Sequence, residues 1–288
     1  MTTVGVFFQS SRPLSWVNTA YPFAFVYFAI TQSIDWALIV GSLFFLIPYN
    51  LLMYGINDVF DYESDIRNPR KGGVEGAKLG PALHKPMLWT ATLVALPFVA
   101  WLVWVGSWES WFWLALSLFS VVAYSVPGLR FKERPFVDSL TSSAHFVSPA
   151  AYGVALAGGS VDGTGVLAFA AFFLWGAASH AFGAVQDVVY DREAGIGSIA
   201  TVIGARRTVR LAVVGYVLAG ALMLLTPWPV MLISLAALFY LMAVAPFWSI
   251  TDDTATTANR GWRWFLAINF AAGAWITLVA INAGYLPL

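Results

Sequence analysis

The chain has 288 residues, of which 59% are hydrophobic and only 10% are charged, and its 15 Lys and Arg residues equal its 15 Asp and Glu residues. This composition is too apolar for a soluble domain of this length and indicates a polytopic membrane protein. The net charge is zero, which excludes a nucleic-acid-binding protein because such proteins need a basic excess. The sequence has no cysteine, which excludes disulfides, thiolate catalysis and Cys-ligated metal sites.

Apolar runs with the length of a bilayer-spanning helix, about 20 residues, recur along the whole chain. No linker-like change of composition divides them. We therefore predict an all-α membrane protein with nine transmembrane helices in a single domain, 1–288. The predicted helices cover 14–32, 36–56, 87–106, 109–127, 137–157, 164–186, 208–226, 229–249 and 262–284.

The charged residues that connect these helices are distributed unevenly. All the Lys and Arg residues lie at one set of helix ends, whereas the short turns at the opposite ends carry only Asp35, Glu109 and Asp162. Lys and Arg are enriched in cytoplasmic loops. We therefore predict a multi-pass protein of the cell membrane whose N-terminus and cation-bearing loops are cytoplasmic.

A dense acidic cluster follows the second predicted helix. On a helix that turns about 100° per residue, Asp58, Asp61 and Asp65 would share one stripe, with Asn57 at its edge. Carboxylates stacked in this way repel one another, so we expect a counter-cation. Oxygen ligands without His or Cys favour Mg²⁺ as that cation.

A second acidic cluster follows the sixth predicted helix, where Asp187 and Asp191 repeat the spacing. Residues 186–188 also echo 57–59, as expected for a pseudo-symmetric bundle. One acidic cluster is commonly no more than a solvated loop, but two at equivalent helix ends favour a metal and diphosphate site. The predicted metal ligands are Asn57, Asp58, Asp61, Asp65, Asp187 and Asp191, and the predicted catalytic residues are Asp58, Asp61, Asp187 and Asp191.

Basic residues accompany both acidic clusters. Guanidinium and ammonium groups bind phosphate oxygens, so these residues are predicted to hold a diphosphate, and Arg67 and Lys132 are favoured among them. Contacts with lipid head groups that fix the topology are the alternative interpretation. The predicted diphosphate ligands are Arg67, Arg70, Lys71, Arg130, Lys132 and Arg192.

The two motifs, Asn57-Asp58-x-x-Asp61-x-x-x-Asp65 and Asp187-x-x-x-Asp191, resemble those of the UbiA superfamily of intramembrane prenyltransferases. Segments 11–22, 55–73 and 198–206 are further similar to lycopene elongases, the bacterial enzymes of fifty-carbon carotenoid synthesis. The resemblance implies that the aspartates of both motifs and the motif asparagine bind metal. Quinone-pathway relatives differ at Gln186, Tyr190 and Arg192, which we interpret as a feature of the subfamily.

The resemblance also implies the reaction. Dimethylallyl units would pass from dimethylallyl diphosphate to both ends of lycopene through a Mg²⁺-assisted allylic carbocation, giving a flavuxanthin-type product. The expected partners are these two substrates, membrane lipid and other carotenoid pathway enzymes. Within this assignment, the predicted acceptor pocket contains Asn18, Tyr54 and Tyr124.

Two other functions remain open on the sequence. A UbiA-type enzyme could prenylate an aromatic or quinone precursor, which would favour an ionisable group in the pocket to deprotonate a phenol. A transporter could bind a cation through carboxylates within the membrane, but such groups are expected near the bilayer midplane. The acidic clusters here are predicted at helix ends.

Overall fold

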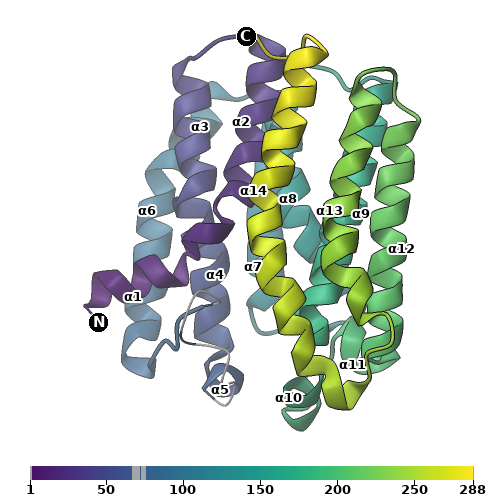
Figure 1. Cartoon of the computed structure of the whole chain (residues 1–288). Helices are drawn as coiled ribbons and strands as arrows, with labels where there is room; N and C mark the ends of the chain where they lie inside the picture. Colours follow the sequence, from purple (N-terminus) through teal and green to yellow (C-terminus); the bar gives the residue numbers. More distant parts are fainter. Residues whose placement is uncertain (1, 67–71, 73–75, 288) are drawn as a thin grey trace. The chain divides into compact units, whose positions relative to one another are not determined.

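The computed structural model describes residues 2–66, 72 and 76–287, and their regular secondary structure is helical (Figure 1). The all-α prediction is therefore confirmed for these residues. Arg67, Arg70 and Lys71 lie outside the described residues.

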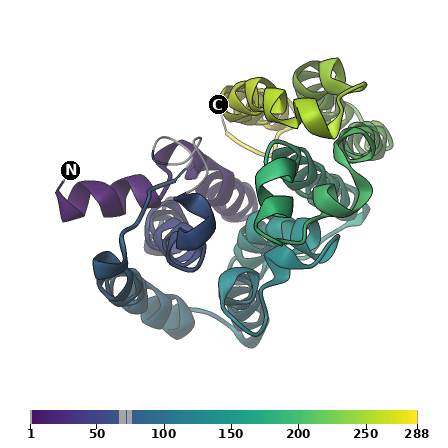
Figure 2. The same cartoon turned by 90° about the horizontal axis from the view of Figure 1, so that it is seen from below.

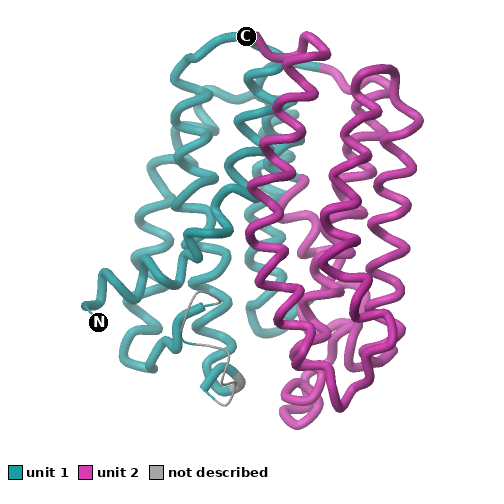
Figure 3. Tube along the Cα trace, in the orientation of Figure 1, with its two compact units in different colours: residues 1–131, 148–159 teal, residues 132–147, 160–288 magenta. Residues whose placement is uncertain are grey.

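The chain forms two compact units (Figure 3). Unit 1 contains residues 1–131 and 148–159, and unit 2 contains residues 132–147 and 160–288. One of the three divisions between the units falls inside the helix α8 (Val137–Leu156), next to Pro149. The prediction of a single domain stays a prediction.

Unit 1 is a bundle of helices with one short helix, α1, lying crosswise to the long ones (Figure 1). Within the bundle, α2 packs on α3, while α4 packs on both α6 and α7. The helices of this unit, in addition to the second half of α8, are α1 (Thr3–Ser10), α2 (Val17–Thr31), α3 (Trp36–Leu46), α4 (Pro48–Phe60), α5 (Tyr62–Asp65), α6 (His84–Val105) and α7 (Trp108–Ser125).

Local sequence signals explain where several of these helices begin. Asp35 caps α3 by accepting a hydrogen bond from the backbone N–H of Leu38 at 2.9 Å. Pro48 has no N–H to continue α3, so the helix breaks at Ile47 and α4 begins at the proline. The second predicted span is therefore two successive helices.

Aromatic rings fill the core of unit 1. Phe23 is fully buried and stacks on Tyr27 and on Tyr152, with 5.8 Å between ring centroids in both pairs. Its ring also lies 5.2 Å from that of Phe45. Gly41 on α3 lies directly against the Phe23 ring, which holds α2 and α3 close together.

Unit 2 is a second helical bundle, and Figure 2 shows the long helices nearly end-on. Its core contains stacked aromatic pairs, Tyr216 with Tyr240 at 5.3 Å and Trp262 with Phe265 at 4.7 Å. In addition to the first half of α8, the helices of this unit are α9 (Gly163–Val185), α10 (Val188–Glu193), α11 (Ile199–Ile203), α12 (Ala205–Leu224), α13 (Ala236–Val244) and α14 (Asn259–Asn282). Short 3-10 helices precede α13 and α14, namely η4 (Val230–Leu235) and η6 (Asp252–Ala258).

Six helical segments of the described residues are long and apolar enough to cross a membrane. They are Trp36–Phe60, Pro81–Val105, Gly163–Val185, Ala205–Leu224, Val230–Phe247 and Asp252–Asn282. The predicted number of nine is not confirmed, although helices also occupy the other three ranges. Of the helices in these ranges, α2 has only 15 residues. The helices α7 and α8 are continuous, but serines and the acids Glu109 and Asp138 interrupt their apolar sequence.

We predict that Gly41→Ala destabilises unit 1. A Cβ atom at residue 41 would lie 2.2 Å from the Phe23 ring, and that ring cannot move aside because Tyr27, Phe45 and Tyr152 surround it. Overpacking of this kind costs about 1–3 kcal/mol. The measurement is the thermal unfolding of the purified protein in detergent.

Gly273→Ala in α14 is the matched control, because no described neighbour lies within 4 Å of the new Cβ position. This substitution should leave the unfolding temperature unchanged or raise it, since alanine favours a helix over glycine. Equal destabilisation by both substitutions would contradict the packing described for Gly41.

Candidate functional site

The acidic cluster of unit 1 begins where α4 ends. The helix stops at Phe60, but its hydrogen bonding continues: the N–H of Asp61 donates to Asn57 O, and the N–H of Asp65 donates to Asp61 O, each at 2.9 Å. Asn57, Asp61 and Asp65 therefore follow one another on successive turns. This continued helical hydrogen bonding also keeps Asp58 near the same face as Asp61 and Asp65. Asn57 and Asp65 are buried, and Asp61 is partly exposed.

The end of α7 brings polar groups to this stripe. The Ser125 hydroxyl donates to Asn57 Oδ1 at 3.2 Å, and Arg130 Nη2 lies 3.9 Å from Asp61 Oδ1. The side chains of Asp61 and Arg130 are 15% and 31% exposed. An acidic and a basic residue that the sequence predicts for one site are therefore neighbours here, and both are partly exposed.

Asp58 has a different environment. Its side chain is fully buried, and its carboxylate accepts hydrogen bonds from Ser10 Oγ at 2.6 Å, Arg12 Nη2 at 3.1 Å and the Ala77 N–H at 3.2 Å. The sequence analysis did not assign Arg12 to the site. The only signal for it was its place in the segment 11–22, which resembles lycopene elongases.

In unit 2, Asp187 and Asp191 lie one turn apart at the junction between α9 and α10, where the Asp191 N–H donates to Asp187 O at 2.8 Å. Both side chains are partly exposed. The neighbouring Gln186 is buried, and its Oε1 accepts a hydrogen bond from Asn259 Nδ2 at 2.8 Å. Unit 2 therefore presents two carboxylates on consecutive turns. The neighbouring Gln186 amide is hydrogen-bonded to the first residue of α14.

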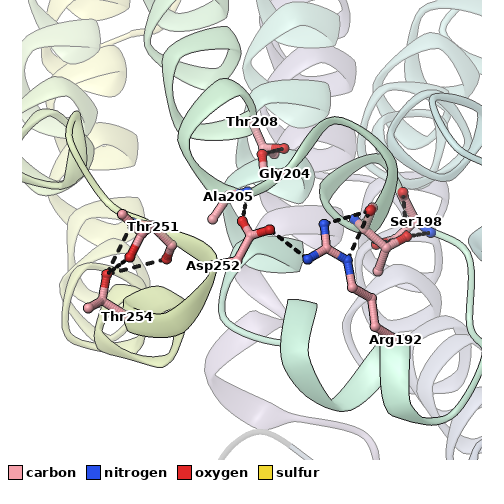
Figure 4. A network of polar contacts seen from close by, with 9 residues as sticks. Arg192, Ser198, Gly204, Ala205, Thr208, Thr251, Asp252 and Thr254 are labelled. Carbon is pink, nitrogen blue, oxygen red and sulfur yellow. Dashed lines mark hydrogen bonds and ion pairs between the residues drawn. The ribbon is translucent and has the colours of Figure 1, made fainter.

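Arg192 holds helix ends together rather than pointing away to a ligand (Figure 4). Its Nε and Nη2 donate to Thr201 O at 3.1 and 2.9 Å, and its Nη1 donates to Asp252 Oδ2. Asp252 Oδ1 in turn accepts the N–H of Ala205 at 2.7 Å. These contacts join α10, α11 and η6, and the Arg192 side chain remains 43% exposed. The prediction that Arg192 binds diphosphate stays a prediction.

Asp138 is a buried acid that the sequence analysis missed. Its carboxylate accepts the N–H groups of Ser139 and Ile199, each at 2.7 Å, and its side chain has no exposed surface. Ile199 begins α11, so Asp138 fixes the start of α11 to the start of α8. No local spacing distinguishes this residue from an ordinary first-turn acid, because its partner lies 61 residues away in the chain.

The remaining predicted residues are partly exposed. Asn18 on α2, Tyr54 on α4 and Tyr124 on α7 belong to unit 1, and one face of the Tyr54 ring is covered by the Arg12 guanidinium at 4.2 Å. Lys132 lies in the 3-10 helix η3 (Phe131–Glu133) and belongs to unit 2.

Among residues 2–66, 72 and 76–287, no group of three or more His, Asp or Glu side chains could by itself hold a metal ion. The exposed donors at both helix ends are nevertheless oxygen atoms of the type that Mg²⁺ prefers. Magnesium commonly takes one or two protein carboxylates and completes its coordination with water and substrate phosphates. The donors of each helix end, taken separately, therefore fit magnesium that binds together with a diphosphate.

Comparison with known proteins agrees with this chemistry. The chain is 53% identical over 281 residues to the lycopene elongase/hydratase of Corynebacterium glutamicum, which covers 98% of both chains. It is also 53% identical over 275 residues to the C(50) beta-cyclic carotenoids biosynthesis protein LbtBC of Dietzia sp. (strain CQ4), covering 95% of this chain and 64% of that protein.

The fold is also that of a solved membrane protein. The structure of a UbiA homolog from Archaeoglobus fulgidus bound to DMAPP and Mg²⁺ matches with a TM-score of 0.68 and 19% identity, covering 93% of this chain and 99% of that one. The UbiA prenyltransferase family itself matches residues 19–270. The chain therefore belongs to the UbiA prenyltransferase family.

Proposed function

We propose that this membrane prenyltransferase is a lycopene elongase, which transfers dimethylallyl units from dimethylallyl diphosphate to both ends of lycopene. The observation that carries the proposal is the full-length identity of 53% with a lycopene elongase/hydratase. A second relative at the same identity is named for the biosynthesis of fifty-carbon carotenoids, which agrees with the addition of two five-carbon units to a forty-carbon acceptor.

The proposed metal ligands are Asn57, Asp61 and Asp65 of unit 1 and Asp187 and Asp191 of unit 2. Their spacing on successive turns and the partial exposure of Asp61, Asp187 and Asp191 support this assignment. Asp58 is left out because its carboxylate accepts hydrogen bonds from Ser10, Arg12 and Ala77. When bound, Mg²⁺ supplies positive charge that stabilises the leaving diphosphate.

Basic residues would share the diphosphate charge with the metal. Arg130 is the best supported of them, because it is partly exposed and already lies beside Asp61. Lys132, two residues further along the chain, is the second. Arg67, Arg70 and Lys71 remain in the proposal on the sequence alone. Charge-assisted contacts of this kind are the strong ones in phosphate binding.

The chain's remaining task is to hold the acceptor and to exclude water. The allylic C–O bond breaks with its electron pair on the diphosphate, the terminal alkene of lycopene forms the new C–C bond, and the resulting tertiary cation loses a proton or gains a hydroxyl from water. Tyr54 and Tyr124 are the proposed aromatic walls, since a ring face attracts a cation in a dry site. Asn18 is proposed to lie in the same pocket.

We predict that Asp61→Asn, Asp187→Asn and Asp191→Asn each lower prenyl transfer by roughly 100-fold or more. A catalytic metal contributes several kcal/mol to the transition state, and each tenfold in rate corresponds to about 1.4 kcal/mol. The assay uses membranes with Mg²⁺, dimethylallyl diphosphate and lycopene, and it follows the product by chromatography and mass spectrometry.

Glu63→Gln and Glu193→Gln are the matched controls. Each removes an exposed carboxylate close to one of the clusters without touching the proposed ligands. Both should retain activity near that of the unchanged protein. Normal turnover by a well-expressed Asp61 or Asp187 variant would refute the metal assignment.

The acceptor generates a separate prediction. Attack requires a free terminal alkene held against the dimethylallyl group, so lycopene should be converted stepwise through a product elongated at one end. Cyclised β-carotene lacks this alkene and should be inert in the same membranes.

One result of this assay would contradict the elongase proposal. If lycopene is unchanged while an aromatic acid or quinone precursor is prenylated, the elongase proposal is wrong and the family assignment alone remains. The mass of the lycopene product also shows whether the tertiary cation loses a proton or takes up water. At each elongated end of lycopene, uptake of water gives a product about 18 mass units heavier than loss of a proton.

We propose that the acidic helix ends face the cytoplasm, since the Lys and Arg residues lie beside them. The chain has no cysteine, so Lys78→Cys and Ser33→Cys create single labelling sites at exposed residues. Residue 78 lies beyond the α4 end, and Ser33 lies in the turn between α2 and α3. A membrane-impermeant maleimide should label residue 78 only from the cytoplasmic side and residue 33 only from outside; the opposite pattern would invert the topology.

A further inference from the structure

Asp58 is enclosed by three donors from two separate parts of the chain, residues 10–12 and residue 77. Ser10 Oγ and the Ala77 N–H both donate to its Oδ2, at 2.6 and 3.2 Å, and Arg12 Nη2 donates to its Oδ1 at 3.1 Å. The side chain has no exposed surface. A Mg²⁺ ligand must let the ion approach to about 2.1 Å and keep its water shell nearby. The carboxylate of Asp58 offers no such approach, unlike that of Asp61.

Arg12 is held in an unusual position by this pair. Its backbone has φ +52°, in the left-handed region, directly before the 3-10 helix η1 (Pro13–Ser15). Its guanidinium lies 4.2 Å above the Tyr54 ring. Burial alone would lower the pKa of Arg12, but Asp58, Tyr54 and Asp65 together raise it, so the side chain stays charged.

The backbone of residues 76–77 closes over the pair. A Cβ at Gly76 would lie 3.0 Å from Arg12 Nη2 and 3.2 Å from Asp58 Oδ1, and the residue has φ +128°, which favours glycine. The next residue, Ala77, is buried and donates to Asp58. One ion pair therefore joins the segment 10–12, the end of α4 and the segment 76–77.

We propose that Asp58 is a positioning residue that binds Arg12, not a metal ligand, although it lies within the acidic motif. The pair fixes the Arg12 guanidinium against Tyr54 and orients the end of α4, on which Asn57 and Asp61 lie. The expected effects on prenyl transfer rest on the proposed function, whereas the contacts between Asp58 and Arg12 are independent of it. A neutral pair is also easier to bury than either charge alone.

The test is a double-mutant cycle of Asp58→Asn and Arg12→Gln. Each single substitution leaves the other charge buried without its partner, so each should lower kcat/KM for lycopene by about tenfold or more. Half-saturating Mg²⁺ should stay within about twofold of the unchanged protein, because no metal ligand is lost. The double variant, which has two neutral amides, should recover part of the lost activity.

Asp61→Asn is the matched control within the same motif. As the loss of a proposed ligand, it should raise half-saturating Mg²⁺ by roughly tenfold to a hundredfold. Adding Arg12→Gln should not restore its activity, since Arg12 binds Asp58 and not Asp61.

Two measurements need no substrate. In thermal unfolding, the double variant should be more stable than either single variant, even where a single variant is poorly folded. A spin label on Lys78→Cys, next to Ala77, should become more mobile in Asp58→Asn than in the otherwise unchanged protein.

The proposal is overturned if Asp58→Asn raises the Mg²⁺ requirement as Asp61→Asn does, or if Arg12→Gln restores neither activity nor stability to it. A metal ligand lost at residue 58 could not be replaced by a change at residue 12. If the unchanged protein fails to convert lycopene, the proposed function fails, but the unfolding cycle and the spin label still decide whether Asp58 anchors Arg12.

Discussion

Enclosed carboxylates hold the helix ends of this protein in place. Asp58 in unit 1 and Asp138 in unit 2 have no exposed surface, and each accepts the backbone N–H of a distant residue, Ala77 or Ile199. A buried charge is costly unless it is fully hydrogen-bonded, so each carboxylate requires its partners to stay where they are. In unit 1 these contacts tie the end of α4, which carries the acidic motif, to residues 10–12 and 77, and in unit 2 they tie α8 to α11.

The acids near the helix ends consequently divide into two kinds. Asp58 and Asp138 are satisfied by the protein, whereas Asp61, Asp187 and Asp191 keep exposed oxygens. A satisfied carboxylate orders the chain, and an exposed one can still bind a cation with its phosphate ligands. Two arginines also lie near these acids: Arg192 joins helix ends, and the partly exposed Arg130 lies beside Asp61.

Much of the fold followed from local patterns. Hydrophobic runs located the helices, and Asp61 and Asp187 lie at helix ends, directly after α4 and directly before α10. Helical spacing placed Asp58 beside Asp61 and Asp65, but it could not show that Ser10, Arg12 and Ala77 enclose the Asp58 carboxylate. The number of membrane spans was not confirmed, because α2 is short and polar residues interrupt α7 and α8.

The sequence by itself determined the membrane class, the helical fold and the residue types of the site, because composition, periodicity and motif spacing are local properties of the chain. Only the tertiary structure decided which acids are enclosed and which are open. That choice depends on Ser10, Arg12 and Ala77 for Asp58, residues that lie far from it in sequence. Spacing along one helix can bring carboxylates onto a common face, but only the packing of other segments determines whether a metal or a guanidinium reaches them.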